Sequence, residues 1–427
     1  MSASVPAERS EAGRKPSQVP QGAGFALAVL TAMNLLNYLD RYVPSSVKDL
    51  FKKDLGLTDT QTSLPLTAFV IVYMITSPVF GSLADKWPRK VLIASGVALW
   101  SLATAAASLA HSFAVFLLAR ALVGVGEAAY ATLSPPLLAD FYPAERRNRV
   151  LTIFYIAIPV GSALGYILGG QVGVLLGWRW AFLIAGLPGL AAAALVLLVK
   201  EPGRGRFDID AGAQPPAWPT ALRLLASNRE YVLAVAGYTA VTFASGALAD
   251  WFPTFLNRHR AMGLDQADWL TGFSAVVGGL AGTITGGRVA DALKRFTRHP
   301  YLAVCAVGTG MATLLACGAL LATSRPIIIA FIFAAQFFLW WYNAPINAVL
   351  VNTVPSAMRA RAFSLSILCI HLLGDAISPT VIGVVSDRSG LSFAIALVPV
   401  MLGVGTVIWA WAWRTLPLAE SRNVAVR

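Results

Sequence analysis

Charge is scarce in this chain of 427 residues: Asp, Glu, Lys and Arg make up 13% of it, whereas hydrophobic residues make up 57%. A soluble globular protein carries roughly 25% charged residues, so the composition excludes a water-soluble protein. Cysteine is nearly absent as well. Cys305, Cys317 and Cys369 lie in apolar stretches without the spacing of metal ligands. We interpret them as small hydrophobic residues, and they give no indication of the redox compartment.

The sequence also lacks the motifs of catalysis. It has no nucleophile beside a base, no His or Cys metal cluster and no nucleotide-binding loop, and its glycines stand at helix-packing steps in apolar runs. We therefore expect neither an enzyme nor a bound cofactor. The net charge of +12 comes mostly from short gaps between apolar runs. Because no soluble basic module carries this charge, it does not indicate a nucleic-acid partner.

Apolar runs are what the chain has in abundance. A helix of about 20 apolar residues crosses a bilayer, and helices satisfy their own backbone hydrogen bonds in lipid. We expect an all-α membrane protein with twelve spans, over residues 22–47, 61–84, 91–110, 113–139, 150–173, 180–199, 230–256, 268–290, 301–323, 326–352, 362–386 and 391–413.

The longest hydrophilic interruption follows the sixth span and separates two sets of six. Its Pro and Gly residues indicate a linker, within which Trp218 to Leu225 is amphipathic and suited to the membrane surface. The expected organisation is a disordered cytoplasmic tail over 1–20, an N-terminal bundle over 21–199, a linker over 200–229, a C-terminal bundle over 230–415 and a tail over 416–427.

Lysine and arginine are distributed unevenly between the two sides of the membrane. The termini and every second loop contain 22 of them, and the opposite loops contain 8. Because loops rich in Lys and Arg stay in the cytoplasm, we expect both termini and the linker to be cytoplasmic.

Four charged residues lie deep inside two spans. Asp40 and Arg41 are the only formal charges in the first span, and Arg120 and Glu127 stand on one face of the fourth. Charges at such depth are costly unless they are paired or face water, so they predict a functional site. We expect Asp40 and Glu127 to accept protons, while Arg41 and Arg120 act as counterions that turn to an anionic substrate in one state. The alternative is a static quartet that fixes helix registry.

A short motif follows the second span and recurs after the eighth, with Gly, Asp and a basic residue at four-residue steps: Gly81, Asp85 and Arg89, then Gly287, Asp291 and Arg295. We expect its charges to latch the two bundles together at the cytoplasmic face, with Asp140 as a partner. The alternative is a solvated salt bridge worth under about 1 kcal/mol.

This repeated motif resembles the major facilitator superfamily, and the resemblance extends from about Gly22 to Trp413. It implies two pseudo-symmetric six-helix bundles that rock about a central cavity, opening it to each side of the membrane in turn.

Two branches of the superfamily are similar in the charged quartet: spinster-type lipid transporters and proton-coupled symporters of organic anions. The run over residues 140–166, from Asp140-Phe141-Tyr142-Pro143 onward, resembles the spinster branch. That resemblance implies a proton-coupled transporter for an amphipathic or anionic, lysolipid-like or sphingolipid-like molecule. We expect a monomer surrounded by membrane lipids, in a bacterial inner membrane. The alternatives are a symporter of small organic anions such as sugar acids, and a non-transporting receptor.

The second half contains fewer charges in its spans. His371 and Asp375 lie four residues apart on one face of the eleventh span, and the tenth has an aromatic and amide face that includes Trp340, Tyr342 and Asn343. We expect these residues to border the cavity, where the aromatic face would receive an acyl chain. The alternative for the aromatic residues is helix packing, and for His371 an ordinary hydrogen bond.

Overall fold

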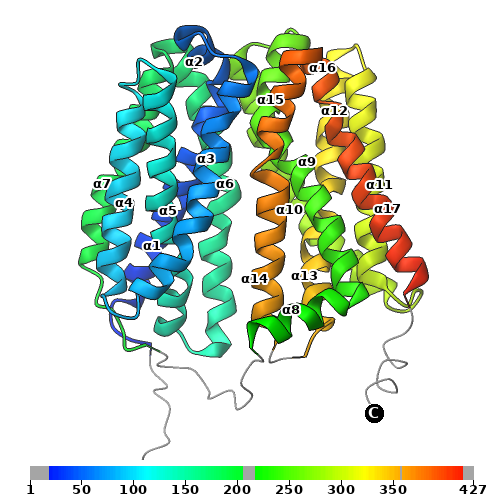
Figure 1. The fold of residues 1–427 in the computed structure, drawn as a ribbon, viewed down its shortest axis with the longest axis horizontal. Helices are drawn as coiled ribbons and strands as arrows, with labels where there is room; N and C mark the ends of the chain where they lie inside the picture. Colours follow the sequence, from blue (N-terminus) through cyan, green and yellow to red (C-terminus); the bar gives the residue numbers. More distant parts are fainter. Residues whose placement is uncertain (1–18, 205–216, 356–357, 417–427) are drawn as a thin grey trace, which may run out of the picture.

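The computed structural model describes residues 19–204, 217–355 and 358–416. Within this part, twelve helices are long and apolar enough to cross a membrane, and they form two halves that stand side by side (Figure 1). The predicted fold class, an all-α membrane bundle of twelve spans in two halves, is confirmed. Most of both expected tails and the middle of the linker, residues 205–216, lie outside the described residues.

The first half consists of α1 (Ala23–Ser46), α2 (Lys48–Leu55), α3 (Asp59–Leu83), α4 (Arg89–Ala107), α5 (Phe113–Phe141), α6 (Ala144–Leu176) and α7 (Trp178–Leu197). The amphipathic linker segment forms α8 (Trp218–Ser227). The second half consists of α9 (Arg229–His259), α10 (Leu264–Leu293), α11 (Pro300–Leu321), α12 (Arg325–Leu339), η1 (Trp340–Tyr342), α13 (Asn343–Asn352), α14 (Arg359–Ile370), η3 (His371–Asp375), α15 (Ser378–Ser389), α16 (Leu391–Ala394) and α17 (Leu397–Thr415).

Three features differ from the expected pattern of spans. α2 is a separate short helix that directly follows the first span. The tenth span is interrupted by η1, a single 3₁₀ turn, and the eleventh by η3, a π-helical turn. Each break precedes a proline, Pro345 or Pro379, which has no amide hydrogen to donate to the carbonyl four residues before it. The regular hydrogen-bond pattern therefore changes in mid-span.

Glycines on α6 bring this helix against α1. A Cβ atom placed on Gly161 would lie 2.4 Å from the carbonyl oxygen of Leu35, and one on Gly165 equally close to that of Leu39. Only a residue without a Cβ permits such an approach of two backbones. The small-residue stripe expected to bring another helix close to α6 thus contacts the span that carries Asp40 and Arg41.

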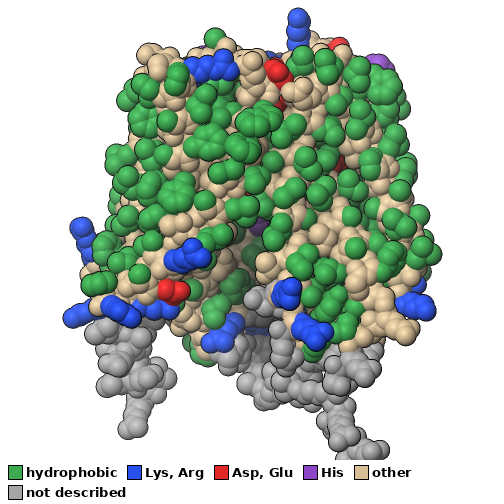
Figure 2. All heavy atoms as spheres, turned by 180° about the vertical axis from the view of Figure 1, so that it is seen from behind, with side chains coloured by type: hydrophobic (Ala, Val, Ile, Leu, Met, Phe, Trp, Pro, Cys, Tyr) green, Lys and Arg blue, Asp and Glu red, His purple; other side chains and the backbone are tan. Residues whose placement is uncertain are grey.

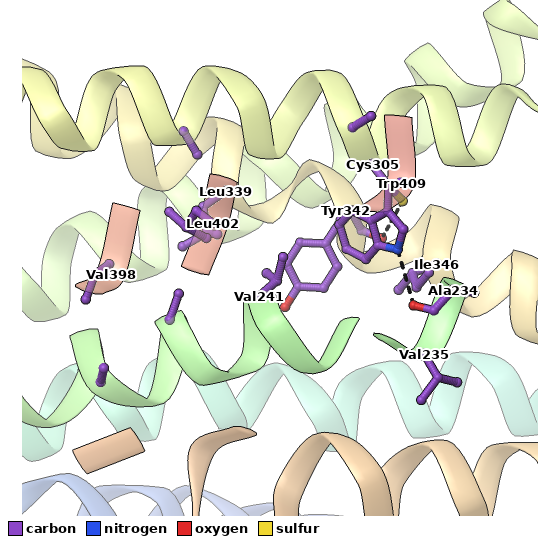
Figure 3. Packing of buried hydrophobic residues seen from close by; sticks show 14 of the residues in the cluster. Ala234, Val235, Val241, Cys305, Leu339, Tyr342, Ile346, Val398, Leu402 and Trp409 are labelled. Atoms are coloured by element: carbon purple, nitrogen blue, oxygen red, sulfur yellow. Dashed lines mark hydrogen bonds between the residues drawn. The ribbon is translucent and has the colours of Figure 1, made fainter. Parts of the chain in front are cut away.

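A large apolar core fills the second half. Trp409 of α17 is fully buried there, its indole nitrogen donates to the carbonyl of Ala234, and its ring packs beside Tyr342 (Figure 3). A Cβ on Gly237 of α9 would lie 2.3 Å from the indole nitrogen of Trp409. Trp409 therefore fills a space that the absence of a side chain on Gly237 provides.

The two halves touch at the end of the molecule that carries α2, which we call the α2 end. There α1 contacts α9, α3 contacts α15 and α6 contacts α10. Towards the opposite end, which carries α8 and both ends of the described chain and which we call the α8 end, Figure 2 shows a hollow between the halves. The molecule is thus closed at one end and hollowed at the other.

We predict that Trp409→Ala destabilises the protein, because it leaves a large cavity in the core of the second half. Truncation of a buried aromatic residue costs about 3–5 kcal/mol in soluble proteins. The matched control is Trp411→Ala on the same helix, where the side chain is half exposed. Thermal unfolding of the detergent-solubilised protein should show a melting temperature lower by several degrees for the first variant alone. Equal melting temperatures would contradict the packing described.

Candidate functional site

The charged quartet lies where α1, α4 and α5 meet. Pro44 of α1 has no amide hydrogen, so the carbonyl of Asp40 lacks its usual helical donor just where the charged pair begins. In α5, a Cβ on Gly124 would lie 2.5 Å from the carbonyl oxygen of Phe69, and one on Gly126 2.4 Å from that of Gly96. These glycines draw α5 against α3 and α4 and so fix the position of its two charged side chains.

Asp40 is bonded to α5 and α4. Its Oδ1 lies 3.1 Å from Nη1 of Arg120, and its Oδ2 accepts a hydrogen bond from the hydroxyl of Thr104. Both charged side chains are 1% exposed. A buried ion pair is tolerated only when further hydrogen bonds satisfy its polar atoms, and Thr104 supplies one of them.

Arg41 and Glu127 form the other pair, in which the partners are crossed between the two helices. Nη2 of Arg41 lies 2.7 Å from Oε2 of Glu127. Glu127 is fully buried, whereas the Arg41 side chain is 21% exposed. Oε1 of Glu127 and Nε of Arg41 are buried without a hydrogen-bond partner among the described residues. This pair is therefore less completely satisfied than the pair of Asp40 and Arg120.

Aromatic rings surround the guanidinium of Arg41. Its Cζ lies 4.7 Å from the ring centre of Tyr38, 4.9 Å from that of Phe69 and 5.7 Å from that of Tyr73. A cation over a ring face is attracted by the ring quadrupole, by about 0.5–2 kcal/mol. The rings thus provide Arg41 with stabilisation that does not depend on Glu127. The sequence gave no signal for Phe69 or Tyr73, because aromatic residues are common in apolar spans.

The first copy of the loop motif lies at the α8 end. Arg89 is buried there, with Nη1 2.7 Å from Asp140 and Nε 2.8 Å from Glu201. Asp85 instead has an 84% exposed side chain, and its nearest cation is Arg204, at 4.0 Å. Gly81 has ample room, since the nearest atom to an added Cβ lies 4.0 Å away.

The second copy is similar in being confined to its own half. Asp291 lies 2.6 Å from Lys294 in the same loop, and both side chains are exposed. Arg295 is exposed, and an added Cβ on Gly287 would have its nearest contact 3.8 Å away. The ion pairs described for both copies join residues of one half. The latch expected between the bundles is not formed by these pairs in this conformation.

His371 and Asp375 lie together in η3, the π turn. Nδ1 of His371 is 2.9 Å from the carboxylate of Asp375, and both side chains are partly exposed although they stand in mid-span. Trp340 packs against Gly279 of α10, and the backbone carbonyl of Asn343 accepts a hydrogen bond from Asn347. Tyr342 is 7% exposed within the core of the second half, so it packs between helices and does not border a cavity.

Ion pairs join the halves at the α2 end. Lys48 is bonded to Asp250 of α9, which also accepts a hydrogen bond from Ser45. Both charged side chains are almost fully buried, and the ammonium group lies 3.8 Å from the ring centre of Trp251. Burial lowers the pKa of Lys48, and the charge of Asp250 opposes that shift. Sequence reasoning had placed Asp250 at a membrane interface, because its partner is far away in the chain.

A second group of contacts surrounds Asp59, the first residue of α3. Asp59 is bonded to Lys52 of α2, to Arg258 of α9 and to the hydroxyl of Ser386 of α15. The carboxylate of Asp387 accepts hydrogen bonds from the backbone amides of Asp59 and Thr60, at 2.8 and 2.9 Å. An acid from one half thus binds the positive end of a helix in the other.

A fold of twelve spans in two halves, hollowed between them and with a charged site in the first, is that of a membrane transporter. The family model of the Major Facilitator Superfamily matches residues 30–298. Protein spinster homolog 1 of Rattus norvegicus is 39% identical over 385 residues, which cover 85% of this chain and 72% of that protein. Its counterpart in Homo sapiens is 38% identical and the alignment covers 86% and 74%. The chain therefore belongs to the spinster family of major facilitator transporters and is not an enzyme.

Protein spinster of Drosophila melanogaster is 35% identical, with 90% of this chain and 64% of that protein covered. Among solved structures, a bacterial homolog to the human lysosomal transporter spinster, in an inward-facing and unoccupied conformation, has a TM-score of 0.82 at 22% identity, with coverage of 93% and 98%. A D-xylose-proton symporter has a TM-score of 0.69 at 18% identity, with coverage of 92% and 98%. Both structures share the fold of this chain.

We predict that Lys48→Met opens the α2 end, because it leaves Asp250 buried without its cation. Breaking one partner of a buried pair costs about 3–5 kcal/mol, whereas replacing both is often nearly neutral. Spin labels on Lys53 and Arg388, exposed at this end in opposite halves, report the opening. Their distance distribution should widen in Lys48→Met and return towards that of the parent protein in Lys48→Met/Asp250→Leu. An unchanged distribution in the single variant would show that this pair does not hold the halves together.

Proposed function

We propose that the chain is a proton-coupled secondary active transporter that moves an amphipathic, anionic lipid-like molecule, of lysolipid or sphingolipid type, by alternating access. The observation that carries this proposal is the crossed pairing of the quartet: one pair is fully buried and hydrogen-bonded, and the other is incompletely satisfied and partly exposed. A transporter needs a charge that exchanges partners. Arg41 and Glu127 have that character.

The proposed orientation places the α8 end in the cytoplasm. The excess of Lys and Arg in the termini and every second loop, 22 against 8, supports it. The hollow then opens to the cytoplasm, and the ion pairs of Lys48, Asp59 and Arg258 close the opposite side. For a bacterial member, this corresponds to the inner membrane.

Glu127 is the proposed first proton acceptor. A carboxylate removed from water is stable only while a cation is bonded to it, so departure of Arg41 favours the neutral acid. Protonation of Oε2 in turn removes the attraction that holds Nη2 of Arg41. The released guanidinium remains on the rings of Tyr38, Phe69 and Tyr73, from which it can bind a phosphate or carboxylate group. A proton and an anionic headgroup thus exchange at one side chain.

Asp40 and Arg120 form the second exchange pair in this scheme. The bond from Thr104 keeps Asp40 charged and in place while Arg41 moves, because a hydroxyl donor stabilises the carboxylate. The second half contributes uncharged and apolar surface and the His371–Asp375 pair. Few cations there suit a molecule with one anionic group and a long apolar part.

We predict that lysolipids enter proteoliposomes in response to an imposed pH gradient, and that sugar acids do not. The apolar part of a lysolipid gains free energy from the aromatic surface about Arg41, of about 25 cal/mol per Å² buried, whereas a sugar acid gains none. Uptake of labelled lysolipids and of sugar acids is measured with and without a proton ionophore. Gradient-driven uptake of sugar acids alone would replace this proposal by a symporter of small organic anions.

We predict that Glu127→Gln and Asp40→Asn abolish pH-driven accumulation. Each amide is close in shape to the acid but cannot exchange a proton, so uptake should fall to the level of passive equilibration. Exchange of internal for external substrate, which needs no net proton movement, should persist in Glu127→Gln. Asp54→Asn is the control, since this acid is exposed and bonded to Arg179 outside the spans. Full accumulation in both quartet variants would contradict coupling at this site.

A further inference from the structure

Asp268 is a buried acid that the scheme above does not use. It lies in the second turn of α10 with no solvent exposure, and neither carboxyl oxygen has a hydrogen-bond or ion-pair partner among the described residues. The side chain points at α6 of the other half. A Cβ placed on Gly170 would lie 2.6 Å from Oδ2 of Asp268, so the acid occupies the space above a glycine in the contact between the halves.

The charged groups around Asp268 do not compensate an ionised carboxylate. Those that act on it electrostatically are the acids Asp265, on its own helix, and Asp49 of α2. α6 contributes Tyr166, whose hydroxyl donates to the carbonyl of Ala249. The nearby cations are bonded elsewhere: Lys48 to Asp250, Arg258 to Asp49 and Asp59, and Arg325 to Gln266.

The remaining neighbours of α10 contribute no charge at this depth. α12 and η1 pack against it farther along, where Gly278, Gly282 and Gly286 receive Gln336, Phe337 and Trp341. Burying an isolated carboxylate costs far more than burying the neutral acid, so such a group takes up a proton instead. With the halves in contact, Asp268 is therefore neutral.

Water lies close to this contact. A groove of about 560 Å³ opens beside it, and its lining includes Gln171, next to Gly170, and Asp265, Gln266 and Arg325. These polar side chains flank Asp268 on both helices. A small separation of α6 and α10 would therefore connect the carboxyl group to solvent at the α2 end.

We propose that Asp268 is a protonation switch for closure of the α2 end. When the halves separate there, the O–H bond of the carboxylic acid breaks, the proton passes to water in the groove, and the carboxylate is left hydrated. To close again, the group must first recover a proton from the same side, because the space above Gly170 does not accept it as an anion. The inference deepens the proposed function and rests on alternating access, but it does not require proton exchange at the quartet.

The switch makes closure depend on the pH at the α2 end. One proton is bound in the closed form and lost in the open form, so above the pKa of the hydrated acid the ratio of closed to open changes about tenfold per pH unit. Low pH on that side favours closure. The four residues of the quartet lie elsewhere, in the first half, and add their own dependence independently.

The test measures this ratio without substrate, from the distance between spin labels on Lys53 and Arg388 in nanodiscs over a pH series. Asp268→Asn, which mimics the neutral acid, should stay closed at high pH, and the logarithm of its closed-to-open ratio should lose about one unit of slope against pH. The matched control is Asp265→Asn, one turn earlier, which should retain the parent slope. A parent slope in Asp268→Asn overturns the proposal.

A second measurement does not depend on how Asp268→Asn folds. In an Asp40→Asn/Glu127→Gln background, infrared spectra of the closed form should still contain the carbonyl stretch of a buried carboxylic acid, and it should disappear as the labels move apart. Absence of that band in the closed form overturns the switch. Failure of the proposed function is distinct: uptake by the parent protein would then ignore the pH gradient, whereas the two slopes would still differ.

Discussion

Lys48 and Asp250 are bonded across the two halves, and Asp40, Arg41, Arg120 and Glu127 are bonded in crossed pairs within the first. These interactions share one constraint, which is that a charge removed from water must keep a partner or lose its charge. Around Lys48 the partner belongs to the other half, so the ion pair binds the halves to each other. In the quartet both partners belong to the same half. Its pairs can therefore rearrange without separating the two bundles.

The two ends of the molecule are held in different ways. At the α2 end the contacts combine charge with close backbone approach: Asp387 binds the first amides of α3, and Gly383 of α15 lies against the backbone of Asp59 and Thr60. At the α8 end, Arg89 is bonded to Asp140 and Glu201 of its own half. Ion pairs between the halves therefore stabilise this conformation at one end only, and the hollow lies at the other.

Much of the fold could be predicted from the sequence, because spans and their grouping depend on local hydropathy. The twelve apolar runs correspond to the twelve helices that are long and apolar enough to cross a membrane. The breaks at η1 and η3 escaped prediction, although Pro345 and Pro379 were their signal. A proline inside an apolar run is compatible with an unbroken helix, as Pro159 within α6 shows, so its effect depends on packing.

The site was predicted in its members and not in its pairing. Charges within apolar spans are conspicuous in a sequence, which is why the quartet could be named. Which arginine binds which acid depends on the rotation of α1 against α5, and Thr104 has no signal that distinguishes it from other small residues. Tyr342 was expected at a cavity and lies in the core, since an aromatic residue of a span packs equally well in either place. Asp268 was counted among the residues of an apolar run, and only its contact with the other half makes it exceptional.

The crossed arrangement of the quartet also has an evolutionary consequence. Each of the two helices supplies one acid and one base, and each of these is bonded to a residue of the other helix. A substitution that removes a charge from α1 leaves an opposite charge stranded in α5, and a second substitution in α1 strands the other. Neutral drift at any of these positions therefore requires a matching change on the other helix, so the four codons are inherited as a single unit.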